Sequence, residues 1–221
     1  MPRREFDKAL QALVNHLLEL GDMVDKAIER SIEQLTSRDI EGARQLARDD
    51  SKINAKRFAI EESCLLLLAT QQPMARDLRI IAAIMAITTD LERMGDHAEG
   101  TAKITIMLGQ EPLVMPLVDI AKMDDKARDM LHRSLKAFVA GDVEAAKAIA
   151  AEDDEVDRLN EQVYGELIKR MIENPETIQR ATYLLWVSHN LERIADRVTN
   201  ICERIVFMVT GRMEEMNVSK Y

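Results

Sequence analysis

The stretch DLERMGD at residues 90–96 reappears a hundred residues later as NLERIAD at residues 190–196. Farther upstream the chain matches itself at an offset of 103, where RSI at residues 30–32 corresponds to RSL at residues 133–135. Two small deletions in one copy account for the change of offset. The sequence therefore predicts an internal repeat of about one hundred residues.

Apolar residues recur at helical spacing within each copy, and few residues interrupt the pattern. Residues 37–39 and 141–142 are typical of a turn followed by a helix N-cap, while Pro73 and Pro175 each mark a break before a new helix. Three helices per copy follow, over residues 5–36, 39–71, 74–108, 117–140, 142–173 and 176–210.

The segment 109–116 combines one glycine with two prolines between the copies, which places a domain boundary between residues 110 and 111. Long helices joined by short turns must lie antiparallel. We expect an all-α fold of two tandem antiparallel three-helix bundles, one in residues 1–110 and one in residues 111–221, with a loose C-terminal tail from Gly211.

Composition excludes several classes of function. Of 221 residues, 30 are basic and 39 acidic, and a net charge of −9 disfavours binding to nucleic acid or to an anionic membrane surface. No apolar run is long enough to span a bilayer, so we expect a cytoplasmic protein without membrane insertion. Cys64 and Cys202 are expected to be buried thiols, and Trp186 a core anchor.

Paired carboxylates four residues apart are the main chemical feature of the second copy. Glu192 and Asp196 form one pair, and Asp153 and Asp157 form another on the preceding helix. Asp157 and Glu192 are equally far from the turn at residues 174–175, as are Asp153 and Asp196, so the four carboxylates share one level. His189 lies near the same face of its helix.

The first copy carries a similar set, with Glu92 and Asp96 on one helix and Asp50 and Asn54 on the other. Their levels differ by one residue, about 1.5 Å of helix rise. Oxygen ligands suit Mg, Ca, Mn or iron, and a bound cation would relieve the repulsion between the carboxylates. The alternative is a solvated acidic surface that Arg93 and Arg193 partly neutralise.

Motifs for other chemistry are missing from the sequence. It contains no phosphate-binding GxxxxGK[ST] loop, no GxGxxG, no GxSxG, no HExxH and no Glu-x-x-His pair of the di-iron bundles. The residues therefore predict metal binding without an obvious redox apparatus.

The two DLERMGD-like stretches on tandem three-helix repeats, together with QPMARDLR at residues 72–79, resemble the PhoU family over residues 5–210. The resemblance implies a negative regulator of phosphate uptake and of phosphate-starvation signalling. Its implied partners are the ATPase subunit of a phosphate ABC importer, a sensor histidine kinase and a second copy in a homodimer. It implies a metal-binding helical adaptor and not an enzyme; a metal-free helical scaffold and a metal-dependent enzyme are the alternatives.

The same resemblance implies multinuclear metal sites, with iron or zinc as the ions of the family, at E/D-x-x-x-D motifs. Mg or Mn is compatible with the oxygen ligands. The residues concerned are Asp50, Asn54, Glu92, Asp96, Asp153, Asp157, Glu192 and Asp196. Asn54 departs from the family pattern because it offers only a neutral amide oxygen.

Overall fold

The computed structural model describes residues 3–216, and these form an all-α fold, as predicted. Six long helical segments follow the order expected from the repeat, and the fifth is interrupted. The elements are α1 (Arg3–Ser37), α2 (Ile40–Gln71), α3 (Arg76–Leu108), α4 (Val118–Ala140), α5 (Val143–Ala150), α6 (Asp153–Glu173), the 3-10 helix η1 (Pro175–Thr177) and α7 (Ile178–Thr210).

The predicted N-caps are confirmed at equivalent positions of the two repeats. Asp39 accepts a hydrogen bond from the backbone N–H of Gly42 at 2.9 Å, and Asp142 accepts one from Ala145 at 3.0 Å. Both bonds satisfy a backbone donor that the first helical turn leaves without a partner. The chain direction at the start of α2 and α5 is therefore set by local sequence.

The prediction of one continuous helix over residues 142–173 is wrong, because the chain turns at Ala151 and Glu152 between α5 and α6. The Glu152 carboxylate accepts hydrogen bonds from Arg133 at 2.7 and 2.6 Å and pairs with Lys126 at 2.7 Å. The first turn of α6 carries only acidic side chains at Asp153–Glu155, which favour a helix N-terminus.

The third helix begins at Arg76 instead of residue 74. Gln72 and Ala75 adopt positive φ angles of 45° and 48°, so the backbone that flanks Pro73 leaves the helical region before α3 starts. At the equivalent turn of the second repeat, Pro175 starts η1 directly and the Asn174 side chain accepts a hydrogen bond from Glu176 N–H.

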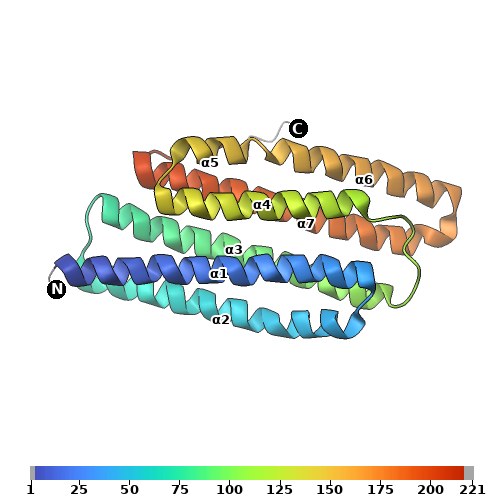
Figure 1. Cartoon of the computed structure of the whole chain (residues 1–221), viewed down its shortest axis with the longest axis horizontal. Helices are drawn as coiled ribbons and strands as arrows, with labels where there is room; N and C mark the ends of the chain where they lie inside the picture. The colour runs from blue at the N-terminus through green and yellow to red at the C-terminus, as the bar shows by residue number, and fades with distance from the viewer. Residues whose placement is uncertain (1–2, 217–221) are drawn as a thin grey trace.

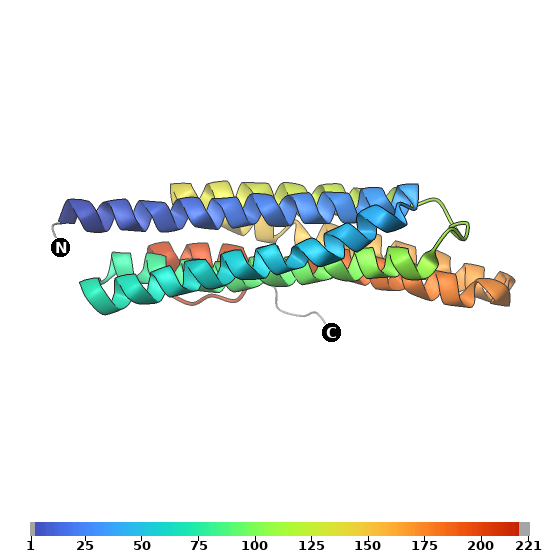
Figure 2. The ribbon, with the colours of Figure 1, turned by 90° about the horizontal axis from the view of Figure 1, so that it is seen from below.

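The two three-helix repeats lie side by side along their length, with α3 and α7 in contact between them (Figure 1). The α2–α3 turn and the α6–α7 turn lie at opposite ends of the molecule, as Figure 2 also shows. One continuous hydrophobic core extends through both repeats, from Leu17 and Ile84 to Leu184 and Ile205. The boundary between residues 110 and 111 stays a prediction.

Two equivalent contacts form where α3 meets α7. Asp90 accepts from Arg197 at 3.4 Å, and His97 lies 3.3 Å from the amide oxygen of Asn190. An offset of 100 relates Asp90 to Asn190 and His97 to Arg197. The two contacts are therefore the same contact made twice, and the two repeats are related by an approximate two-fold axis.

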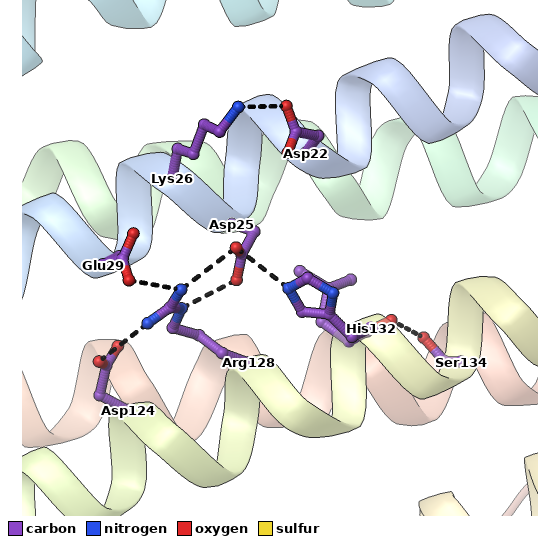
Figure 3. A network of polar contacts seen from close by, with 9 residues as sticks. Asp22, Asp25, Lys26, Glu29, Asp124, Arg128, His132 and Ser134 are labelled. Atoms are coloured by element: carbon purple, nitrogen blue, oxygen red, sulfur yellow. Dashed lines mark hydrogen bonds and ion pairs between the residues drawn. The ribbon is translucent and has the colours of Figure 1, made fainter.

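A second junction joins α1 to α4 (Figure 3). Arg128 donates to both oxygens of Asp25, at 2.8 and 3.2 Å, and pairs with Glu29 at 2.9 Å. His132 Nε2 lies 3.1 Å from Asp25, and Asp124 lies 4.0 Å from Arg128. Burial raises the pKa of Asp25, but these hydrogen bonds outweigh burial and hold the pKa below its usual range.

Trp186 is not a core anchor, because 51% of it is exposed. The buried stripe of α7 runs through Leu184, Val187, Leu191 and Ile194, and Trp186 lies on the opposite side of the helix.

Residues 211–216 of the tail are also less loose than expected. Met216 N–H donates to Glu203 at 2.9 Å, which holds the segment against α7; residues 217–221 lie outside the described part.

Cys64 and Cys202 are buried free thiols, as predicted, and burial raises the pKa of Cys64 to about 11. Within residues 3–216, no helix has the length and apolar character needed to cross a membrane.

Candidate metal centre

The second repeat brings its four predicted carboxylates together between α6 and α7. Asp157, Glu192 and Asp196 line one groove of about 860 Å³. Asp153, in the first turn of α6, is only 3% exposed. Burial, followed by the negative charges of Asp157, Asp196 and Glu192, raises the pKa of Asp153 to about 7. The equal-level argument from the sequence therefore places these side chains correctly.

Glu192 is the second carboxylate of the cluster whose ionisation is disfavoured. Burial, and then the charges of Asp196 and Asp157, raise its pKa to about 7. Its Oε2 atom is buried and accepts no hydrogen bond, although His189 Nδ1 lies 3.2 Å away. That contact is not a hydrogen bond, so this buried carboxylate oxygen lacks a donor.

Arg193 opposes the repulsion in this cluster. It forms an ion pair with Asp196 three residues later, and Arg158 and Arg204 also line the groove. The predicted neutralisation of this surface by Arg193 is thus present in the structure. The Arg193 side chain pairs with Asp196, and Glu192 Oε2 still accepts no hydrogen bond.

The first repeat brings Asp50, Glu92 and Asp96 together in the same way. Neighbouring polar side chains donate hydrogen bonds to Asp50 and Glu92. Asn54 Nδ2 donates to Asp50 at 2.7 Å, and Arg57 donates to Glu92 at 2.6 Å. Asn54 is therefore a donor within the cluster, with its amide nitrogen turned to the carboxylate. Only Asp50 Oδ1 is left buried without a hydrogen bond among these groups.

Glu99 belongs to the first cluster and was missed in the sequence analysis. Burial and then the charges of Glu99, Asp96 and Glu92 raise the pKa of Asp50. Glu99 follows Asp96 by three residues, which places both on one helix face, so the spacing alone could have indicated it. In the second repeat, Glu161 and Glu203 line the groove and were likewise missed.

The second cluster fits a hard metal ion in the chemistry of its donors, because it supplies several carboxylates, two of them with raised pKa. Its side chains are not arranged around one point. Throughout residues 3–216, no group of three His, Cys, Asp or Glu side chains is placed to hold a metal ion. Metal binding here would require the carboxylates to change rotamer, with Arg193 released from Asp196.

Comparison with known proteins gives a family match for each repeat. The PhoU domain model matches residues 17–105 and 120–205. The chain is 35% identical to the "Phosphate-specific transport system accessory protein PhoU homolog" of Clostridium acetobutylicum, over 98% of this chain and 100% of that protein. The protein of the same description from Streptococcus pneumoniae serotype 4 is 35% identical, over 97% and 100% respectively.

Solved structures show the same fold. The crystal structure of "the phosphate transport system regulatory protein PhoU from Streptococcus pneumoniae" matches with a TM-score of 0.88 and 34% identity, covering 95% of this chain and 99% of that one. The crystal structure of PhoU from Pseudomonas aeruginosa matches with a TM-score of 0.89 and 33% identity, covering 94% and 100%.

Proposed function

This chain belongs to the PhoU domain family, and from that premise we propose that it is a cytoplasmic accessory protein that restrains phosphate uptake and phosphate-starvation signalling. The observation that carries the proposal is the match of both repeats to the domain, together with relatives at 35% identity over nearly the whole chain. Those relatives are described as accessory proteins of phosphate-specific transport.

The proposed role is that of an adaptor, not a catalyst. Its partners are the ATPase subunit of a phosphate ABC importer and a sensor histidine kinase, and it acts as a homodimer. Long helices that share one core form a stiff body, which supports a role in holding two partners in fixed relation. A net charge of −9 supports protein partners over nucleic acid.

We propose in addition that metal ions bind at the α6–α7 cluster, through Asp153, Asp157, Glu192 and Asp196. When bound, such an ion supplies positive charge that offsets the repulsion among these carboxylates. The buried Glu192 oxygen without a hydrogen bond supports this site. At the first cluster, with Asp50, Asn54, Glu92 and Asp96, binding would be weaker because Arg57 and Asn54 already satisfy part of it.

A metal-free scaffold is the second candidate, and one observation favours it. Arg193 and Arg57 each form an ion pair with a carboxylate of their own cluster, so part of the charge is balanced by the chain itself. On this alternative, removal of metal leaves folding and partner binding unchanged.

Deletion of the gene tests the regulatory role. Cells that lack the protein, grown in phosphate-rich medium, should produce a phosphate-repressible phosphatase that the parent strain represses. Repression should return when the wild-type gene is supplied on a plasmid. Normal repression in the deletion strain would contradict the signalling role of this protein.

A further inference from the structure

One face of α6 changes character along its length. Asp157, Glu161, Tyr164, Ile168 and Ile172 follow one another at intervals of three or four residues, which places them in a single stripe. The acidic members line the groove. Toward the α6–α7 turn the stripe becomes apolar, with Tyr164 58% exposed and Ile172 77% exposed.

α7 also exposes large apolar side chains between the turn and the groove. Ile178, near the turn, is 49% exposed, and Trp186, two helical turns on, is 51% exposed. The Tyr183 ring lies 5.8 Å from the Trp186 ring, so the two aromatic rings support each other. Farther from the turn, Glu192 and Asp196 line the groove.

Both sets of side chains belong to one hairpin, because α6 packs against α7 in an antiparallel arrangement. Tyr164 and Trp186 lie within one residue of the same distance from the turn, and so do Ile172 and Ile178. The pair of helices thus presents one surface with an apolar, aromatic half near the turn and an acidic half beyond it. We call this surface, formed by residues 154–172 of α6 and 178–203 of α7, the α6–α7 face.

Carboxylates outnumber cations in the acidic half. The groove is lined by three arginines and by six carboxylates of α6 and α7, and Glu214 and Glu215 of the segment after α7 also line it; the six are Asp154, Asp157, Glu161, Glu192, Asp196 and Glu203. Large apolar side chains exposed beside such a groove are typical of an interaction surface. Its charge complements a cationic partner and repels an anionic one.

The first repeat differs from the second in its polar and aromatic residues. The counterpart of Trp186 is Ala86, and the counterpart of Glu161 is Phe58. Arg57 pairs with both Glu61 and Glu92, which offsets part of the negative charge at the acidic end of the α2–α3 hairpin. Leu65 and Leu78 are exposed near the turn of that hairpin, so the second repeat is distinguished by Trp186 and Glu161 and not by exposed apolar side chains as such.

We propose that the α6–α7 face docks a cationic amphipathic helix of a partner protein. Leucine-like side chains of that helix would pack on Tyr164, Ile178 and Trp186, and its lysines or arginines would enter the acidic groove. The proposal rests on the adaptor role proposed above and assigns that role a binding surface.

Trp186 is the single tryptophan of the chain, so its fluorescence reports on this face directly. The probe is a synthetic helix of about 18 residues made of Leu and Lys, compared with one in which every Lys is replaced by Glu. Measurements are made on the full chain in buffer with a chelator, so that metal does not compete. The Lys peptide should shift Trp186 emission to the blue and saturate at one peptide per chain, and the Glu peptide should do neither.

Variants separate the two halves of the surface. With a fluorescein-labelled Lys peptide, Trp186→Ala should weaken binding about tenfold. Asp154→Asn/Glu161→Gln should weaken it about threefold or more, with a smaller dependence on salt. The matched control Glu33→Gln/Glu144→Gln removes the same charge from exposed sites elsewhere and should bind as the wild type does.

The proposal would be overturned by equal binding of the Glu peptide, by equal loss in the control variant, or by no change in Trp186 emission at saturation. Sedimentation tests whether the face instead binds a second copy of this chain. A wild-type dimer that is lost in Trp186→Ala would also overturn the proposal. A test in cells separates this surface from the regulatory role. If the gene deletion loses phosphatase repression but the Trp186→Ala strain keeps it, the surface is refuted and the regulatory role stands.

Discussion

Asp124 is a buried carboxylate without full compensation. It is 6% exposed, and its Oδ1 atom accepts no hydrogen bond. Burial raises the pKa of Asp124 from 3.8 to about 7, in spite of the opposing charge of Arg128. The folded protein therefore holds this group protonated at a pH where the unfolded chain ionises it.

This shift fixes the sign of a pH effect on stability. The contribution of Asp124 is fully present below pH 3.8 and is lost as the pH rises toward about 7. Asp124→Asn should therefore raise the free energy of unfolding at pH 8.5, by at most about 4 kcal/mol, and change it little at pH 4. Urea unfolding at the two pH values measures this, with exposed Asp125→Asn as the control. Equal effects at both pH values would contradict the assignment.

The sequence predicts the positions of some side chains and not of others. Glu192 and Asp157 were predictable because antiparallel helices joined by a short turn bring equidistant residues together. Trp186 was not, because its apolar character suggested the core while the actual buried stripe follows Leu184 and Leu191. The Arg57–Glu92 pair depends on side-chain conformation across two helices, which sequence spacing does not determine.

At the scale of elements, the N-caps at Asp39 and Asp142 were predictable from the sequence, and they give a test. Asp39→Ala and Asp142→Ala each remove a hydrogen bond to the first turn of a helix. Each should lower the free energy of unfolding by about 1 kcal/mol, and Ser at the same position should restore most of it. Urea unfolding of the four variants measures this. A loss from Ala that Ser does not recover would show that capping is not the cause.

The break between α5 and α6 was not predictable from local signals. No glycine or proline stands at Ala151 or Glu152, and the turn is accompanied by contacts of Glu152 with Arg133 and Lys126 on α4. The equivalent pair in the first repeat is looser, with Arg30 3.9 Å from Asp49, and α2 continues unbroken. Tertiary contacts thus distinguish two segments whose sequences are similar.

At the scale of the whole molecule, Arg128 joins the two repeats by holding Asp25 and Glu29 of α1. In Arg128→Ala, the buried Asp25 carboxylate keeps only His132 as a partner in that network. The substitution should lower the free energy of unfolding by about 3 kcal/mol. Lys122→Ala, which removes an exposed ion pair on the same helix, should cost less than about 1 kcal/mol. Because the repeats share one core, each variant should still unfold in a single transition.

Separate unfolding of the two repeats in Arg128→Ala, seen as two transitions in urea, would contradict a shared core. The repeat predicted two similar bundles but not how they pack. That arrangement depends on reciprocal contacts such as Asp90–Arg197 and His97–Asn190, whose partners lie about one hundred residues apart. No local pattern in the sequence indicates such pairs.

Elemental analysis of the purified, untagged protein after dialysis against a weak chelator tests the proposed metal site most directly. We expect stoichiometric metal in the wild type and in the control Glu33→Gln/Glu144→Gln, and its loss in Glu192→Gln/Asp196→Asn. Circular dichroism establishes that the variants remain helical. Absence of metal from the wild type, or equal metal in the Glu192→Gln/Asp196→Asn variant, would contradict the metal site and favour the metal-free scaffold.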